Sequence, residues 1–207
     1  MENTVGCSQT CGNTVLCVEK CRSIFLSGEI DIYCATKIIA HLLNFDHVSN
    51  EDIFVYINAS GAALDAGYTV YDTFQNIKSP VNTICVGNAQ SGAGWLLAAG
   101  THGKRFSYPH AEIMMHKIQI SELSGSANEL EKYVSEVEED NKIFLEIFAR
   151  HTGHTLEKVS NDIMEDLNFT PQEALEYGII DHIISPYKKI PKLKVRENKK
   201  RGKYSGK

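Results

Sequence analysis

Residues 84–99, ICVGNAQSGAGWLLAA, decide the fold that this sequence predicts. The segment opens with an apolar run typical of a strand and closes with an apolar run typical of a helix, and Ser91 lies among small residues between them. Small neighbours let a substrate backbone approach closely, and the N-terminus of a helix offers free N–H groups to a developing oxyanion. The pattern therefore fits a serine nucleophile. It fits equally well a small-residue turn that packs a helix on a sheet.

Working outward from this segment, strand-like and helix-like runs alternate. The run 53–57 is continuously apolar, which predicts a strand buried on both faces. Alternation of this kind predicts an α/β fold with a mostly parallel sheet and flanking helices. Further strands are predicted at 23–26, 83–86 and 112–115, helices at 35–43, 63–77 and 127–150, and a last apolar run at 179–184.

Three glycines and one short motif predict where helices end or begin. Gly100, Gly153 and Gly178 each follow a helical run, as glycine does at helix C-termini. Residues 170–173, Thr-Pro-Gln-Glu, form a capping box with proline at the first helical position.

Composition indicates one globular domain with tails. The 207 residues are 43% hydrophobic and 23% charged, with a net charge of −5. No apolar run reaches the roughly 18–20 residues that span a bilayer, and residues 1–4 do not open a signal peptide, so we expect no membrane partner and a cytoplasmic location.

The charge is divided unevenly along the chain. Residues 188–207 hold ten Lys or Arg and one acid, whereas the other 187 residues hold 11 basic and 25 acidic side chains. We interpret the tail as a disordered, solvated extension, with contact to nucleic acid or membrane as the alternative. The acidic body argues against nucleic acid as the main partner.

Four cysteines, Cys7, Cys11, Cys17 and Cys21, are spaced C-x3-C-x5-C-x3-C near the N-terminus. Zinc knuckles have tighter pairs and a longer gap between them, so we expect reduced thiols and no metal, with a metal or redox cluster as the alternative. Cys34 and Cys85 lie in apolar contexts and are expected in the core.

A nucleophilic serine needs a base and a group that orients the base. Of the eight histidines, His116 stands out because it ends an apolar strand, and ligand chemistry gathers at the carboxyl ends of parallel strands. A structural histidine is the alternative. Spacing alone does not select the orienting carboxylate among 26 acids.

Residues 87–100 resemble the nucleophile segment of the Clp protease proteolytic subunit. The resemblance covers about residues 22–186, which we take as the protease domain, with 1–21 as a divergent N-terminal segment and 187–207 as the basic tail. Other matching segments are 24–31, 56–61, 104–106, 113–116, 156–158 and 173–181.

The resemblance implies a crotonase-like α/β fold with a protruding handle helix. It also implies heptameric rings that stack into a tetradecamer around a chamber, either as a homo-oligomer or with a paralogous subunit. An AAA+ unfoldase partner would use ATP and feed chains into the chamber, so this subunit would need no cofactor.

The resemblance further assigns roles. Ser91 would be the nucleophile of a serine endopeptidase, His116 its general base and Asp166 the carboxylate that orients His116. The backbone N–H groups of Gly61 and Gly92 would form the oxyanion hole, and no metal is expected.

The sequence also departs from the family pattern. Ala62 replaces the second glycine of a Ser-Pro-Gly-Gly loop, and would cost about 1 kcal/mol if that position needs a positive φ. Gly92 replaces the usual methionine, and Lys117-Ile118 the usual Gln-Pro. Two alternatives to an active peptidase therefore stay open: a weakly active or regulatory subunit of a mixed barrel, and another crotonase-fold enzyme such as an acyl-CoA hydratase.

Overall fold

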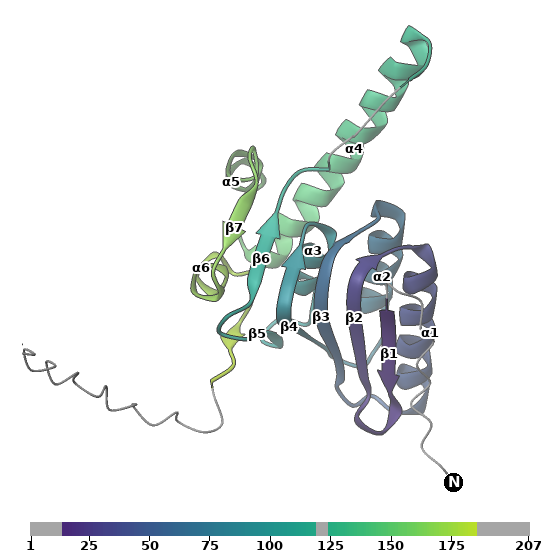
Figure 1. Ribbon diagram of the computed structural model, residues 1–207, viewed down its shortest axis with the longest axis vertical. Helices are drawn as coiled ribbons and strands as arrows, with labels where there is room; N and C mark the ends of the chain where they lie inside the picture. The colour runs from purple at the N-terminus through teal and green to yellow at the C-terminus, as the bar shows by residue number, and fades with distance from the viewer. Residues whose placement is uncertain (1–13, 119–123, 186–207) are drawn as a thin grey trace, which may run out of the picture.

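Three long parallel strands form the centre of the molecule: β2 (Ser23–Ile30), β3 (Ile53–Ala62) and β4 (Val81–Gln90). The structure, a computed structural model, describes residues 14–118 and 124–185. Figure 1 shows the sheet that grows from these strands, in the order β1-β2-β3-β4-β5-β8. The predicted α/β class with a mostly parallel sheet is confirmed.

Short strands complete the sheet on both sides of this centre. β1 (Thr14–Val18) pairs antiparallel with β2. β5 (Arg105–Ser107) and β6 (Glu112–Met115) both pair parallel with β4, β5 near its first residues and β6 near its last. β7 (Leu167–Phe169) is antiparallel to β6, and β8 (His182–Ile183) is parallel to β5. None of β1, β5, β7 and the helix α5 (Leu156–Asp162) was predicted from the sequence.

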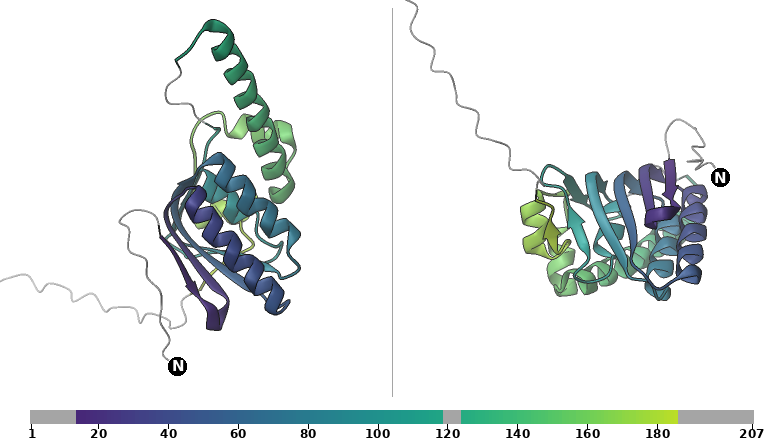
Figure 2. Two further views of the ribbon diagram at one scale, coloured as in Figure 1. Left: turned by 90° about the vertical axis from the view of Figure 1, so that its right-hand side faces the viewer. Right: turned by 90° about the horizontal axis from the view of Figure 1, so that it is seen from below.

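Helices cover one face of this sheet (Figure 2). α1 (Ile32–Val48), α2 (Leu64–Asn76) and α3 (Gly92–Ala98) lie on that face. The buried side chains of β3, such as Val55 and Ile57, belong to the same core as the buried side chains of these helices. The prediction that the strand at 53–57 is buried on both faces is wrong. Tyr56 of that strand is only half-buried and stacks on the exposed Phe25, because no helix formed by residues 14–118 and 124–185 covers the other face.

α4 (Ala127–Thr152) divides into two halves that differ in burial. Its second half packs on the core through four buried side chains. Its first half has no buried residue and projects beyond the rest of the described chain (Figure 1). The four buried residues are Phe144, Leu145, Phe148 and Ala149.

The helix ends follow the local sequence signals with one exception. Gly153 ends α4 at φ 76° and Gly178 ends α6 (Pro171–Tyr177) at φ 82°, and Thr170 caps α6 with Glu173 as predicted. Gly100 follows Ala99, the C-cap of α3, so this helix also ends where predicted; the exception is that Gly100 does not adopt a positive φ. A Cβ at Gly100 would lie 2.4 Å from Thr83 Oγ1, so glycine is needed there for close packing.

Several predictions concern residues outside the described ranges: Cys7, Cys11 and the basic tail. Cys34 and Cys85 are buried, as expected, and Cys17 and Cys21 are free thiols. Within residues 14–118 and 124–185, no helix is long and apolar enough to cross a bilayer. The same ranges contain no group of three or more His, Cys, Asp or Glu side chains arranged to hold a metal ion.

Candidate active site

Ser91 occupies a strained turn between β4 and α3. Its φ of 52° and ψ of −124° are unfavourable for a residue with a Cβ, and such backbone conformations cost about 1–3 kcal/mol. Two hydrogen bonds hold the turn: Ser91 N–H donates to Met114 O at 2.7 Å, and Trp95 N–H donates to Ser91 O at 3.0 Å. The serine is therefore fixed at the carboxyl end of β4, where it is half-buried.

The small residues after Ser91 let α3 approach the sheet closely. A Cβ at Gly94 would lie 2.8 Å from Met115 Sδ, 2.9 Å from Ala89 O and 3.0 Å from Met114 O. These contacts leave no room for a side chain at this position. The small-residue turn that packs a helix on a sheet is thus present, and it is the same turn that carries Ser91.

Strand pairing brings His116 and Asp166 to the same edge of the sheet. β6 is antiparallel to β7, and the last pair of their ladder is Met115 with Leu167. Continued by one residue beyond the ladder, this register would place His116 opposite Asp166. β6 is also parallel to β4, with Met114 beside Gln90, so Ser91 follows on the adjoining strand. All three predicted residues therefore lie at the ends of adjacent strands.

The hydrogen bonds at this edge do not yet connect the three side chains. The Nδ1 atom of His116 lies 2.5 Å from Lys117 O, so Nδ1–H donates to that carbonyl. Within the described residues, no hydrogen bond joins Ser91 Oγ, His116 and the Asp166 carboxylate, which is exposed to solvent. The imidazole is thus held by its neighbouring peptide in this conformation.

The loop at the end of β3 lies against the start of α3. Gly61 has open space where a Cβ would be, and Ala62 does not adopt a positive φ, so the expected strain at Ala62 is absent. A Cβ at Gly92 would lie 2.8 Å from Ala62 Cβ and 2.9 Å from Ala62 O. A side chain at position 92 would therefore clash with both the methyl group and the backbone of Ala62, so glycine is needed there for close packing.

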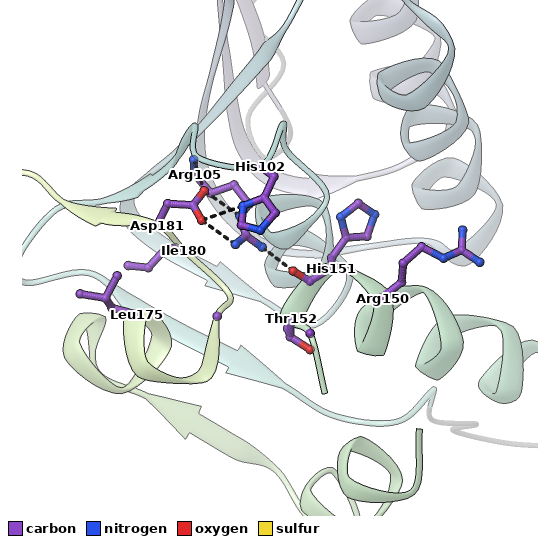
Figure 3. A pocket seen from close by; sticks show the side chains of 10 residues that line it. His102, Arg105, Arg150, His151, Thr152, Leu175, Ile180 and Asp181 are labelled. Atoms are coloured by element: carbon purple, nitrogen blue, oxygen red, sulfur yellow. Dashed lines mark hydrogen bonds and ion pairs between the residues drawn. The ribbon is translucent and has the colours of Figure 1, made fainter. Parts of the chain in front are cut away.

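A cavity of about 300 Å³ lies at the opposite end of β4 (Figure 3). Its centre is the ion pair of Arg105 and Asp181, in which Nε and Nη2 donate to the two carboxylate oxygens at 2.9 and 2.7 Å. Arg105 is only 3% exposed and also donates to Ala98 O and His151 O, so it ties the ends of α3 and α4 to β5. Burial opposes the charge of Asp181, but the hydrogen bonds and charge of Arg105 outweigh it and hold the pKa of that carboxyl below its usual value.

His151, on the wall of this cavity, is neutral at physiological pH. Burial, together with the charges of Arg105, Arg150 and His102, lowers the pKa of His151 to about 4. Its ring packs edge-on against Tyr71, with Nε2 3.3 Å from the Tyr71 hydroxyl oxygen. Since every strong donor and acceptor at the centre of this cavity is paired within the chain, we interpret the cavity as structural.

The edge that carries Ser91 is therefore the candidate active site. The sequence singled out Ser91 and His116 by their places at the ends of apolar strands, whereas Asp166 was found only by resemblance. The family model described as Clp protease matches residues 8–187.

Proposed function

Because the chain belongs to the Clp protease family, we propose that it is an active serine endopeptidase subunit that cleaves unfolded polypeptides inside a ring-shaped chamber. One observation carries this proposal. The register of β4, β6 and β7 supports a shared site for Ser91, His116 and Asp166, although these residues are far apart in the sequence.

The chemistry follows the order of an acyl-enzyme reaction. His116 accepts the hydroxyl proton of Ser91 as Oγ attacks the scissile carbonyl, and then donates it to the leaving amine. A water molecule, deprotonated by His116, hydrolyses the resulting ester. Asp166 stabilises the imidazolium and holds the ring in one tautomer once Nδ1–H turns toward it.

The negative oxygen of the tetrahedral intermediate needs donors close to Ser91. The N–H of Gly92, in the first turn of α3, has no carbonyl four residues earlier within the helix to accept it. We assign Gly61, at the end of the adjacent β3, as the second donor. Loss of one such donor costs serine proteases about 2.7–4 kcal/mol in transition-state stabilisation.

Membership of this family implies an oligomeric proteolytic assembly. The first half of α4 supports this, because it projects from the subunit with Tyr133 and Val134 each more than 40% exposed. A closed oligomer would cover such surface. We propose heptameric rings stacked as a tetradecamer through this helix, served by an AAA+ unfoldase that uses ATP.

A serine-directed fluorophosphonate tests the activity. The probe should label the wild-type protein, and Ser91→Ala should abolish both labelling and peptide cleavage. Ser185→Ala, a change of the same kind at an exposed serine after β8, should leave both unchanged. Undiminished cleavage by Ser91→Ala would refute the assignment.

A second candidate, a weakly active subunit of a mixed barrel, is favoured by the bond between His116 and Lys117 O. The two candidates differ in what the purified chain does alone. Cleavage of peptides by the isolated homo-oligomer supports the first candidate. Cleavage only after mixing with a paralogous proteolytic subunit supports the second.

A further inference from the structure

The peptide group between Lys117 and Ile118 makes a hydrogen bond on each side. Its carbonyl oxygen accepts from Nδ1 of His116 at 2.5 Å, and its N–H donates to Oδ1 of Asn141 at 2.9 Å. A peptide group is planar, and in the trans form its C=O and N–H point in opposite directions. The bond to Asn141 therefore fixes the direction of the carbonyl that holds His116.

Asn141 is itself anchored on a rigid part of α4. The carbonyl of the preceding residue, Asp140, accepts from the Tyr68 hydroxyl of α2 at 3.1 Å. Phe144 and Leu145, within the next turn, are buried in the core. The Asn141 side chain is thus a firm acceptor, while the side chain of Ile118 packs against the edge of the same core.

The donor in this bond exists because residue 118 is isoleucine. A proline at this position, which the family pattern favours, has no N–H and could not donate to Asn141. The departure Lys117-Ile118 therefore adds a contact between the residue pair after His116 and the handle helix α4.

We propose that Asn141 is a positioning residue that acts through the Lys117–Ile118 peptide and keeps Nδ1–H of His116 on the Lys117 carbonyl and off the Asp166 carboxylate. The proposal rests on the peptidase function proposed above. Each turnover then requires Nδ1–H to leave this neutral carbonyl for the charged carboxylate of Asp166. A hydrogen bond to a charged acceptor is the stronger of the two, so His116 turns once the peptide is released.

Two variants of Asn141 with nearly the same size test this. Asn141→Leu removes the acceptor, whereas Asn141→Asp keeps an oxygen that accepts from the Ile118 N–H. Asn141→Leu should raise the rate constant for fluorophosphonate labelling of Ser91, and kcat for a short peptide, by about two- to tenfold, the range that one net hydrogen bond sets. KM should not change. Asn141→Asp, whose carboxylate still accepts from the Ile118 N–H, should not exceed the wild-type rates.

Ile118→Pro removes the donor from the other side of the same bond and should raise both rates as Asn141→Leu does. Combining the two changes should give no further increase, because they break one contact. Lys142→Ala, at an exposed neighbouring position on α4, controls for general effects on the helix and should leave the rates unchanged. If Ile118→Pro does not fold, the labelling rates of Asn141→Leu and Asn141→Asp still test the proposal.

The outcomes separate this inference from the proposed function. Labelling that depends on Ser91 but is equally fast in wild type and Asn141→Leu overturns the inference and leaves the function standing. Slower labelling of Asn141→Leu than of wild type also overturns the inference. The same holds if Asn141→Leu and Ile118→Pro together raise the rate by the product of their separate increases. If Asn141→Leu is labelled and wild type is not, the result supports the inference and indicates that the wild-type subunit is weakly active at rest. No labelling of any variant overturns both.

Discussion

Replacing His151 by phenylalanine should make the fold less sensitive to acid. The folded state holds the pKa of His151 at about 4, chiefly because the ring is buried and secondly because Arg105, Arg150 and His102 lie near it. In the unfolded chain a histidine has a pKa of about 6.5. Phenylalanine keeps the ring contact with Tyr71 but takes up no proton.

The sign and size of the effect follow from proton linkage. Between about pH 6.5 and pH 4 the unfolded chain binds the proton and the folded protein does not, so the free energy of unfolding falls as the pH falls. Above this window both states are neutral, and below it both are protonated, so the loss stops. The full loss is at most about 3.5 kcal/mol, since the two pKa values differ by about 2.5 and a difference of one corresponds to about 1.4 kcal/mol. Solvent screening at this partly exposed ring reduces it.

Urea unfolding followed by the fluorescence of Trp95, the single tryptophan and a buried residue, measures this difference. The midpoint of the wild type should fall more steeply between about pH 7 and pH 4.5 than that of His151→Phe. Tyr71→Phe removes the hydroxyl partner of His151 but leaves the buried imidazole, so it should keep the wild-type pH dependence. Equal pH dependence in wild type and His151→Phe would show that His151 does not carry the effect.

Three further predictions address the site and its support. Asp166→Asn should lower kcat by up to about 10⁴-fold, as loss of the orienting carboxylate does in a Ser-His-Asp set, while native mass spectrometry shows the same assembly as wild type; an unchanged kcat would exclude Asp166 from the reaction. Gly94→Ala should destabilise the fold by about 1–3 kcal/mol in thermal melts, because its Cβ would lie 2.8 Å from Met115 Sδ, and an unchanged melting temperature would contradict the close packing. Asp181→Asn should cost about 3–5 kcal/mol in urea unfolding, because it leaves the buried Arg105 charge without its carboxylate, whereas a loss below about 1 kcal/mol would contradict that pairing.

Local signals in the sequence predicted the elements whose ends are determined locally. The capping box at Thr170 and the glycines at 153 and 178 mark helix ends through contacts within a few residues, and the structure agrees. The helices at 127–150 and 63–77 have apolar residues at helical spacing, and both were found close to their actual bounds.

Elements that depend on distant partners were missed. β5 and β7 have three residues each, too few for a periodic pattern, and they exist because β4 and β6 offer them hydrogen bonds. The place of Asp166 depends on the antiparallel pairing of β7 with β6 across about 50 residues of chain. No short stretch of sequence predicts that pairing, so local sequence patterns could not identify Asp166 as the orienting carboxylate.

The departures from the family pattern are best understood as contacts between positions. Ala62 alone suggested strain, yet in the structure it has no positive φ, and its methyl group and backbone lie where a side chain at Gly92 would begin. The effect of Ile118 likewise depends on Asn141, 23 residues later, whose side chain accepts a hydrogen bond from the Ile118 N–H. A substitution at one member of such a pair changes a contact whose other half lies elsewhere in the sequence. Both pairs border the edge that carries Ser91 and His116, so divergence in this chain has altered the support of the candidate site and kept the residues proposed to do its chemistry.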